Sequence, residues 1–147
     1  MIRRTTSDDP RFRAMVAELD AELWRRYGEG NVEFAPHNVL HTLATCVVAL
    51  DGDTPVGCGA IRPYSTDAIE IKRMYVAPAM RGRGISKQIL AELLAWSREL
   101  GYPFAILETG PEQPEAVGLY ERAGFERTER YSPYLDQPTS ICMRKPL

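Results

Sequence analysis

The sequence predicts an α/β protein of the α+β type. We expect one domain over residues 1–147, with a mixed but mostly antiparallel central sheet of six or seven strands flanked by about four helices. Apolar residues recur at helical spacing in segments 10–27 and 85–100, and between them lie three apolar, β-branched segments separated by turn residues. A strand, a helix and a second strand then follow one another over residues 68–109, which requires one parallel pair.

The composition is that of an ordinary soluble protein, with 44% apolar and 26% charged residues. A formal net charge of −2 gives no basis for a nucleic-acid partner or a polybasic membrane contact. The N-terminus lacks the apolar stretch of a secretion signal, and no run of about 18 apolar residues occurs. We therefore expect a cytoplasmic protein that binds neither nucleic acid nor membrane.

Three cysteines, Cys46, Cys58 and Cys142, are widely separated within apolar, strand-like segments. They have no CxxC spacing, so the sequence predicts no metal site. An odd number of cysteines without a secretion signal also argues against a disulfide framework. We expect buried free thiols, and Cys58 is the one retained as a candidate for facing an active cleft.

The N-terminal region predicts a short strand and then a long helix. Residues 2–5 are consistent with the strand. Ser7-Asp8-Asp9-Pro10 is typical of a helix start, because it offers capping side chains and a proline near the first helical position. Helical spacing continues to about Tyr27, where Gly28 and Gly30 follow, and residues 31–41 indicate no more than a loop or a short helix.

Three strands in an antiparallel meander are expected next. Segment 44–50 leads into Asp51-Gly52-Asp53, which is a strong hairpin signal, and segment 55–61 returns. The glycines of this second strand permit close approach of a neighbouring element. A turn at 65–67 introduces the third strand, 68–76.

The third strand has an irregular apolar pattern. Ile69 and Ile71 alternate, but the next apolar pair is Met74 and Val76, so strict alternation would place the two pairs on opposite faces. A β-bulge near Lys72-Arg73 would return both pairs to one face and re-aim the neighbouring side chains. A strand buried on both faces explains the pattern equally well.

A glycine-bearing turn at 79–86 then opens a helix that is expected to end near Leu100 and Gly101. The remaining elements are expected at 104–109 (a strand parallel to the third), 116–123 (a helix opened by Pro114-Glu115), and 125–130 with 140–145 (an antiparallel pair).

The glycine turn excludes two common phosphate motifs. No GxxxxGKS/T pattern occurs, and Lys87 occupies the position of the third glycine in a dinucleotide fingerprint. Such a turn leaves backbone N–H groups free at the helix N-terminus, where the helix dipole favours an anion. Taken alone, the turn fits either an anion site or a plain strand-to-helix connection.

Three motifs in order resemble the GCN5-related N-acetyltransferase (GNAT) family. Arg81-Gly82-Arg83-Gly84-Ile85-Ser86 resembles the family's Q/R-x-x-G-x-G/A acyl-CoA signature. Met74-Tyr75-Val76-Ala77-Pro78 looks like its cofactor strand, and residues 119–125 (LYERAGF) look like its downstream LYE..GF element. Two features depart from the pattern: Ser86 stands where the family prefers Gly or Ala, and the asparagine often found after the fifth strand is absent.

This resemblance implies the GNAT fold, acetyl-CoA (coenzyme A) as co-substrate and no metal. The pantetheine arm would pair with the third strand, and the pyrophosphate would lie on the glycine turn. The implied cofactor-binding residues are Met74, Tyr75, Val76, Arg81, Gly82, Arg83, Gly84, Ile85 and Ser86. The side chains of Arg81 and Arg83 either add charge to this site or are solvated.

Two catalytic roles follow from the resemblance. Glu70 matches the general-base glutamate of the family's histone-acetylating branch, and Glu33 and Glu108 are alternative carboxylates. Tyr120 matches the tyrosine that protonates the leaving sulfur in many members, and the alternative for this residue is a packed core aromatic.

The expected activity is acetyl transfer to an amine of a small molecule or peptide by direct attack in a ternary complex. A non-catalytic acyl-CoA sensor, an enzyme acting on protein amines and a ping-pong enzyme with a cysteine carrier are the alternatives. The family often forms homodimers. Candidate acceptor contacts on the N-terminal loop, the strand ends and the final hairpin are Tyr27, Glu33, Arg62, Tyr64, Arg73, Tyr131 and Tyr134.

Overall fold

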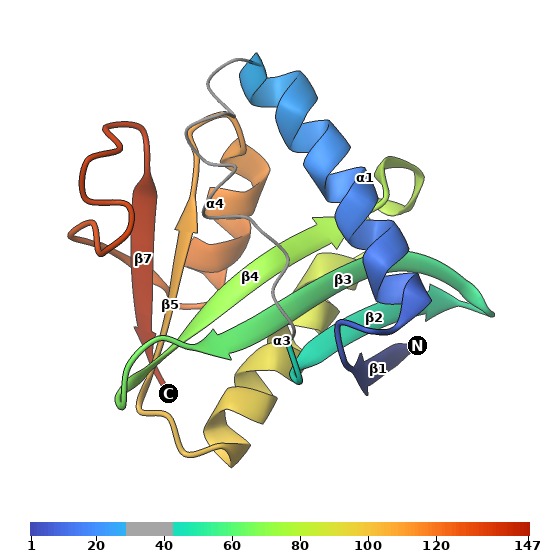
Figure 1. The fold of residues 1–147 in the computed structure, drawn as a ribbon, viewed down its shortest axis with the longest axis horizontal. Helices are drawn as coiled ribbons and strands as arrows, with labels where there is room; N and C mark the ends of the chain where they lie inside the picture. The colour runs from blue at the N-terminus through green and yellow to red at the C-terminus, as the bar shows by residue number, and fades with distance from the viewer. Residues whose placement is uncertain (29–42) are drawn as a thin grey trace.

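The computed structural model describes residues 1–28 and 43–147 and contains a seven-stranded sheet in the order β1-β2-β3-β4-β5-β7-β6 (Figure 1). Every neighbouring pair is antiparallel except β4–β5, which is parallel, so the predicted mixed sheet is confirmed. The strands are β1 (Ile2–Thr5), β2 (Cys46–Asp51), β3 (Thr54–Pro63), β4 (Ala68–Val76), β5 (Phe104–Thr109), β6 (Glu126–Thr128) and β7 (Ile141–Pro146).

Three α-helices and one short 3₁₀ helix lie among the described residues, compared with the four helices expected. They are α1 (Pro10–Tyr27), η3 (Pro78–Met80), α3 (Ile85–Glu99) and α4 (Pro114–Arg122). In Figure 1, α1 crosses in front of the sheet, and α3 and α4 lie behind it. The sheet therefore separates two cores.

Helix α1 begins where its sequence predicts. The Asp9 carboxylate accepts a hydrogen bond from the Arg11 N–H at 2.9 Å, and Pro10 occupies the first helical position. Its apolar stripe (Phe12, Met15, Val16 and Leu19) packs on one face of the sheet with Cys46, Val48, Leu50, Cys58, Ala60 and Tyr75. We call this cluster the α1-side core.

Helix α3 covers the opposite face and forms the α3-side core with Val47, Ile61, Ile69, Ile71, Leu107 and Met143. Two glycines of β3 allow this helix to approach closely, as predicted. A Cβ atom on Gly59 would meet side-chain atoms of Ile89 and Leu93, each at 2.8 Å, and one on Gly57 would meet Ile89 Cδ1 at 3.0 Å.

The predicted bulge in β4 is confirmed. Cys58 pairs with Tyr75 and Ala60 with Lys72, so Gly59 alone faces both Arg73 and Met74. Arg73 has φ = 60°, which is unusual for a residue with a side chain. The bulge returns Ile69, Ile71, Met74 and Val76 to the α3-side core. The strand is also largely buried on its other face, so the alternative explanation holds as well.

Strands β4 and β5 separate just before this bulge. They pair only through Ala68–Phe104, Ile69–Ala105 and Glu70–Ile106, after which β5 continues alongside β7 to Thr109. The edge of β4 from Ile71 to Val76 therefore has no strand partner on the β5 side among residues 1–28 and 43–147. This divergence opens the sheet beside the glycine turn.

The C-terminal elements differ from their predicted bounds by a few residues. Helix α4 begins at Pro114 rather than residue 116, because proline is well suited to the first turn. Strand β6 ends at Thr128 rather than residue 130, since the following segment turns back with Tyr134 buried and the Gln137 N–H bonded to the Tyr134 carbonyl.

Candidate active site

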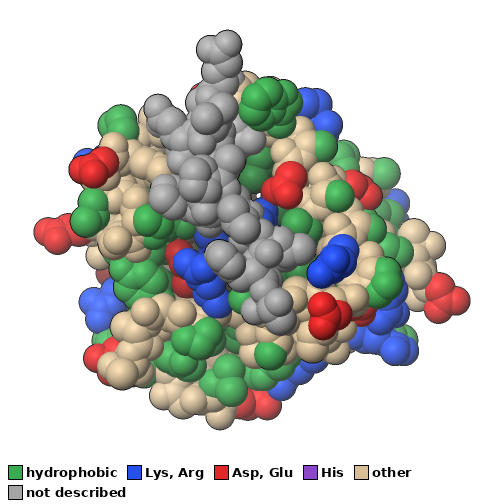
Figure 2. Space-filling model, in the orientation of Figure 1, with side chains coloured by type: hydrophobic (Ala, Val, Ile, Leu, Met, Phe, Trp, Pro, Cys, Tyr) green, Lys and Arg blue, Asp and Glu red, His purple; other side chains and the backbone are tan. Residues whose placement is uncertain are grey.

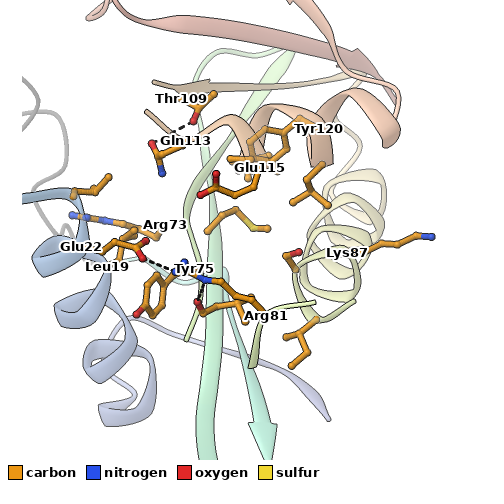
Figure 3. Close-up of a pocket in the computed structure, with 18 of the residues that line it drawn as sticks. Leu19, Glu22, Arg73, Tyr75, Arg81, Lys87, Thr109, Gln113, Glu115 and Tyr120 are labelled. Carbon is orange, nitrogen blue, oxygen red and sulfur yellow. Dashed lines mark hydrogen bonds and ion pairs between the residues drawn. The ribbon is translucent and has the colours of Figure 1, made fainter. Parts of the chain in front are cut away.

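A cavity of about 630 Å³ lies where the two strands diverge. Five segments line it: the C-terminal half of α1, the bulged end of β4, the glycine turn with the start of α3, the end of β5, and α4. Figure 3 shows side chains from these segments facing one another around the space.

The glycine turn forms one end of the cavity. Gly82 and Gly84 have φ values of 80° and 78°, and nothing lies within 4 Å of a Cβ built on either residue. The first N–H of α3 with a backbone partner is that of Gln88, which donates to the Gly84 carbonyl at 3.1 Å. The N–H groups of the turn are therefore available to an anion, at the positive end of the helix dipole.

The two arginines of the turn behave differently. Arg81 donates from Nε to the Val76 carbonyl at 2.9 Å, and its Nη2 lies 2.7 Å from Glu22 Oε1 of α1 (Figure 3). Arg81 therefore links the turn to α1, although the residue is exposed. Arg83 is exposed and does not line the cavity, whereas Lys87, which the sequence argument did not select, does.

The unpaired edge of β4 forms the middle of the cavity. Met74, Tyr75 and Val76 all line it, as do Gly82, Gly84, Ile85 and Ser86 from the turn. The Tyr75 hydroxyl donates to Glu18 at 3.2 Å, and burial raises the pKa of Tyr75 to about 12. The neutral aromatic side chain of Tyr75 thus separates the cavity from α1.

Tyr120 of α4 lines the cavity from the α3 side. It is 6% exposed and packs edge-to-face on Phe125, with ring centroids 5.8 Å apart. No described residue forms a hydrogen bond with its hydroxyl. Burial raises the pKa of Tyr120, with the Glu108 carboxylate contributing in the same direction, so the phenol keeps its proton at neutral pH. Tyr120 is both a core aromatic and a cavity residue.

The carboxylates Glu70 and Glu108 are placed differently. Glu70 is fully buried and does not line the cavity; its carboxylate receives hydrogen bonds from Arg62 Nε at 3.0 Å and from the Tyr131 hydroxyl at 2.8 Å. Glu108 does line the cavity, and Ser140 Oγ donates to it at 2.8 Å. Burial raises the pKa of Glu108 above its usual range, and Ser140 and Lys72 partly oppose that effect.

The predicted acceptor contacts divide into two groups. Tyr27 and Arg73 line the cavity. The other four described residues surround Glu70 instead: Tyr131 stacks edge-on against Tyr64 and Tyr134, with centroids 5.0 Å and 5.5 Å away, and Arg62 pairs with Glu70. Glu33 lies outside the described residues.

Tyr27 joins the end of α1 to the segment after β5. Its hydroxyl donates to Gln113 Oε1 at 3.3 Å, and the position that a Cβ of Gly110 would occupy is only 1.9 Å from the Tyr27 hydroxyl oxygen. Arg26 reinforces the same junction through the Glu112 carbonyl at 2.6 Å and the Glu115 carboxylate at 2.7 Å. This contact closes one side of the cavity.

Several lining residues escaped the sequence argument. They include Leu19, Glu22 and Leu23 of α1, Lys72 of β4, Lys87 of α3, Thr109 and Gln113 near α4, and Glu115 of α4. Lys87 did carry a signal, because a cation in the first turn of a helix opposes the helix dipole and so needs another reason to be there. The α1 residues are indistinguishable in sequence from ordinary core or surface positions.

All three cysteines are buried free thiols, as expected, and none of them lines the cavity. The Cys58 thiol donates to the Arg73 carbonyl at 3.2 Å, and burial raises its pKa. Among residues 1–28 and 43–147, no group of three metal-ligating side chains is present, and no helix there is long and apolar enough to cross a membrane. On the face drawn in Figure 2, the described acidic and basic side chains are interspersed.

The diverging strands, the glycine turn and the buried phenol surround one cavity, as an α+β protein with an acyl-CoA site requires. The family model described as the Acetyltransferase (GNAT) family matches residues 6–125. The chain is 36% identical over 138 residues to an IAA acetyltransferase of Azospirillum brasilense, covering 90% of each chain. It is 31% identical over 139 residues to YjgM, an uncharacterized N-acetyltransferase of Escherichia coli, covering 88% of this chain and 83% of the relative.

Solved structures of acyltransferases have the same fold as this chain. A Klebsiella pneumoniae protein described as an acyl-CoA N-acyltransferase has a TM-score of 0.81 at 31% identity, covering 100% of this chain and 97% of the other. A GNAT acetyltransferase of Elizabethkingia anophelis, solved with acetyl-CoA bound, shares the fold with a TM-score of 0.72 at 20% identity, covering 100% and 97% of the two chains. The chain belongs to the GNAT family of acetyltransferases.

Proposed function

We propose that this protein is an acetyl-CoA-dependent N-acetyltransferase that acts on an amine of a small molecule or peptide by direct attack in a ternary complex. The observation that carries the proposal is one cavity that joins the free N–H groups of the glycine turn, the unpaired edge of β4, Tyr120 and Glu108. Acetyl-CoA supplies the activated thioester. The named relatives, an IAA acetyltransferase and an N-acetyltransferase, support the same chemistry.

The donor end matches the shape and charge of coenzyme A. The N–H groups after Gly82 would bind the pyrophosphate, and the glycines leave room for the phosphate oxygens to approach the backbone. Lys87 lies at the same end, but its side chain points away from the cavity in Figure 3, so the backbone N–H groups would make the phosphate contacts. The pantetheine amides would pair with the edge of β4 at Met74 and Val76, in the manner of an added strand.

Glu108 is proposed as the general base, in preference to Glu70. An alkyl amine has a pKa near 10.4, so only about one molecule in a few thousand is neutral at pH 7. Glu108 faces the cavity, and its raised pKa brings it closer to the working pH of a base. Glu70 is enclosed by Arg62 and Tyr131, and we propose that it organises the aromatic cluster beside the acceptor.

Tyr120 is proposed as the general acid. After the amine attacks the thioester carbon and the C–S bond breaks, the sulfur leaves as a thiolate that needs a proton. The Tyr120 phenol remains protonated because burial raises its pKa, and no described residue holds its hydroxyl in another hydrogen bond. Direct transfer also agrees with the position of the thiols, since none of the three cysteines lines the cavity.

The experiment is to measure acceptor-dependent thiol release from acetyl-CoA with purified protein and a panel of primary amines, amino acids and peptides. Mass spectrometry of the acceptor identifies the acetylated nitrogen. We expect thiol release to require an acceptor. Tight binding of acetyl-CoA without release on any acceptor would contradict the proposal and support a sensor instead.

A further inference from the structure

We propose that the acceptor is a small amine that carries a carboxylate, and that Arg73 binds this carboxylate. The inference rests on the proposed function and narrows its substrate class. Arg73 lies at the bulge of β4 and lines the cavity beside α1. Figure 3 shows it next to Leu19 and Glu22, on the side of the cavity opposite Lys87.

The Arg73 guanidinium is buried but only partly used. Its side chain is 4% exposed, and Nη1 lies 2.8 Å from Asp20 Oδ1. Among the described residues, Nη2 has no hydrogen-bond partner, and it is the one buried side-chain nitrogen or oxygen there in that condition. A charged donor that is buried without a hydrogen-bond partner carries a large desolvation cost, so a group that supplied this partner would stabilise it.

Asp20 neutralises this charge incompletely. The Asp20 side chain is 54% exposed, so water screens much of its attraction for Arg73. A guanidinium binds a carboxylate best through two nitrogens in a fork, and Asp20 engages only one of them. A second carboxylate entering the cavity would complete the hydrogen bonding of Arg73.

The backbone fixes Arg73 in this position. The bulge holds it at φ = 60°, and its carbonyl accepts the Cys58 thiol at 3.2 Å. A side chain other than glycine in this conformation is strained, and strain of this kind concentrates where it serves function. The geometry therefore favours a binding role for Arg73 over a purely structural ion pair.

The anion that Arg73 would bind differs from the donor's phosphates. Those phosphates would lie on the glycine turn and near Lys87, at the start of α3. Arg73 instead lies beside Leu19 and Glu22 of α1 (Figure 3). Together with Glu108 for the amine, Arg73 gives the acceptor end opposite charges, which suit a zwitterion such as an α-amino acid.

The test compares α-amino acids having small, aliphatic, aromatic, acidic and basic side chains with the amines that remain when the carboxylate is removed. Acetylation is measured for the wild type, Arg73→Met and Arg73→Lys. A peptide with a free N-terminal amine, an amidated C-terminus and no acidic side chain separates free amino acids from peptide acceptors. Arg127→Met, on exposed strand β6 outside the cavity, is the control.

We expect the wild type to favour the carboxylate-bearing partner by about 10- to 100-fold in kcat/KM, as a charge-assisted hydrogen bond implies. Arg73→Met should reduce this ratio to near one, mainly by raising KM for the acceptor. Arg73→Lys should retain part of the preference, and Arg127→Met all of it. Equal turnover of acids and decarboxylated amines by the wild type would overturn the inference and leave the proposed function intact.

A binding measurement keeps the test decisive if no amine is acetylated. Acetyl-CoA affinity, measured by calorimetry, first checks that each variant folds with its donor site intact. N-acetyl amino acids are then titrated beside their primary amides. Carboxylate-dependent binding that Arg73→Met abolishes supports the inference even if the proposed function fails. Equal binding of acid and amide, or no binding of either, contradicts it.

Discussion

The two ends of the cavity are built in different ways. The proposed donor end comes from one continuous stretch, 74–87, and offers mainly backbone groups: the edge of β4 and the N–H groups after Gly82. The acceptor end is assembled from α1, β4 and β5, and offers the side chains of Tyr27, Arg73 and Glu108. A contiguous backbone site leaves a sequence motif, whereas an assembled side-chain site does not.

This difference explains why one end accounts for coenzyme binding and the other for acceptor specificity. Backbone N–H groups recognise phosphate without regard to the neighbouring side chains, so one turn can serve a whole family with different acceptors. Specificity for the acceptor depends on a few charged or aromatic side chains, which can change without disturbing the turn. Variants at each end should therefore alter different kinetic constants, and the predictions below use that contrast.

Replacement of Tyr120, the proposed leaving-group acid, should have the largest effect. Tyr120→Phe removes only the hydroxyl and keeps the packing on Phe125. We expect kcat to fall by about 10²- to 10⁴-fold, the usual contribution of a general acid, with little change in acetyl-CoA affinity. Stopped-flow thiol release and calorimetric titration of acetyl-CoA measure the two quantities. An unchanged kcat at every pH would exclude the acid role.

Replacement of Glu108, at the proposed acceptor end, should have the next largest effect on activity. Glu108→Gln should lower kcat/KM for the amine by about 10²-fold near neutral pH. The base works only when ionised, and burial raises its pKa, so wild-type activity should fall with decreasing pH at a point above the usual glutamate range near 4.3. The inflection due to Glu108 should disappear in the variant, whose activity should then follow only the fraction of neutral amine. The defect should shrink at high pH, because the amine then loses its proton unaided.

Glu70→Gln is the matched comparison for this prediction. Glu70 is buried between Arg62 and Tyr131 and does not line the cavity, so its amide variant should retain this inflection. The pH dependence of kcat/KM for both variants, measured in one buffer series, decides between the carboxylates. Loss of the inflection in Glu70→Gln alone would return the base role to Glu70.

A substitution in the glycine turn, at the proposed donor end, should weaken the binding of acetyl-CoA. Gly84→Ala places a side chain at φ = 78°, which costs about 1–2 kcal/mol although the added Cβ meets nothing. If the strain distorts the turn, KM for acetyl-CoA should rise by about 5- to 30-fold, and the acceptor's KM should not change. Gly52→Ala, at φ = 62° in the β2–β3 hairpin, is the control, because it adds similar strain far from the cavity. Equal effects of both substitutions on acetyl-CoA would argue against a special role for the turn.

A change distant from both ends should affect only stability. Asp9→Ala removes the cap of α1 and should lower the free energy of unfolding by about 1 kcal/mol at pH 7. Hydrogen bonds from Arg11 lower the pKa of Asp9, so this stabilisation is present above the unfolded pKa near 3.9 and is lost as pH falls further. Urea unfolding at pH 7 and pH 3 measures the difference between variant and wild type, which should be smaller at pH 3. Kinetic constants at 25 °C should not change.

Much of the fold could be predicted because local signals agreed with it. The Asp9 cap, the hairpin turn at Gly52 and the apolar stripe of α3 each correspond to an observed element. The step from Ile71 to Met74 indicated the bulge, which is present, although a strand buried on both faces explained the same pattern equally well. Small errors at the ends of β6 and α4 reflect caps and turns that depend on tertiary contacts.

The candidate site was predictable only in part. The glycine turn and Tyr120 carry local motifs, whereas Arg62, Tyr64, Tyr131 and Tyr134 gather around Glu70 through contacts between distant segments. No local pattern distinguishes Glu70, which is enclosed, from Glu108, which faces the cavity. Only the pairing of β4 with β5, and its end at Glu70, separates the two positions.

The measurement that tests the account most directly is the initial-velocity pattern with acetyl-CoA and an active acceptor varied together. Both substrates must occupy the one cavity for direct attack, so the account predicts intersecting double-reciprocal lines and no acetylated protein after exposure to acetyl-CoA alone. Parallel lines, together with a stable acetyl adduct on a cysteine, would contradict it.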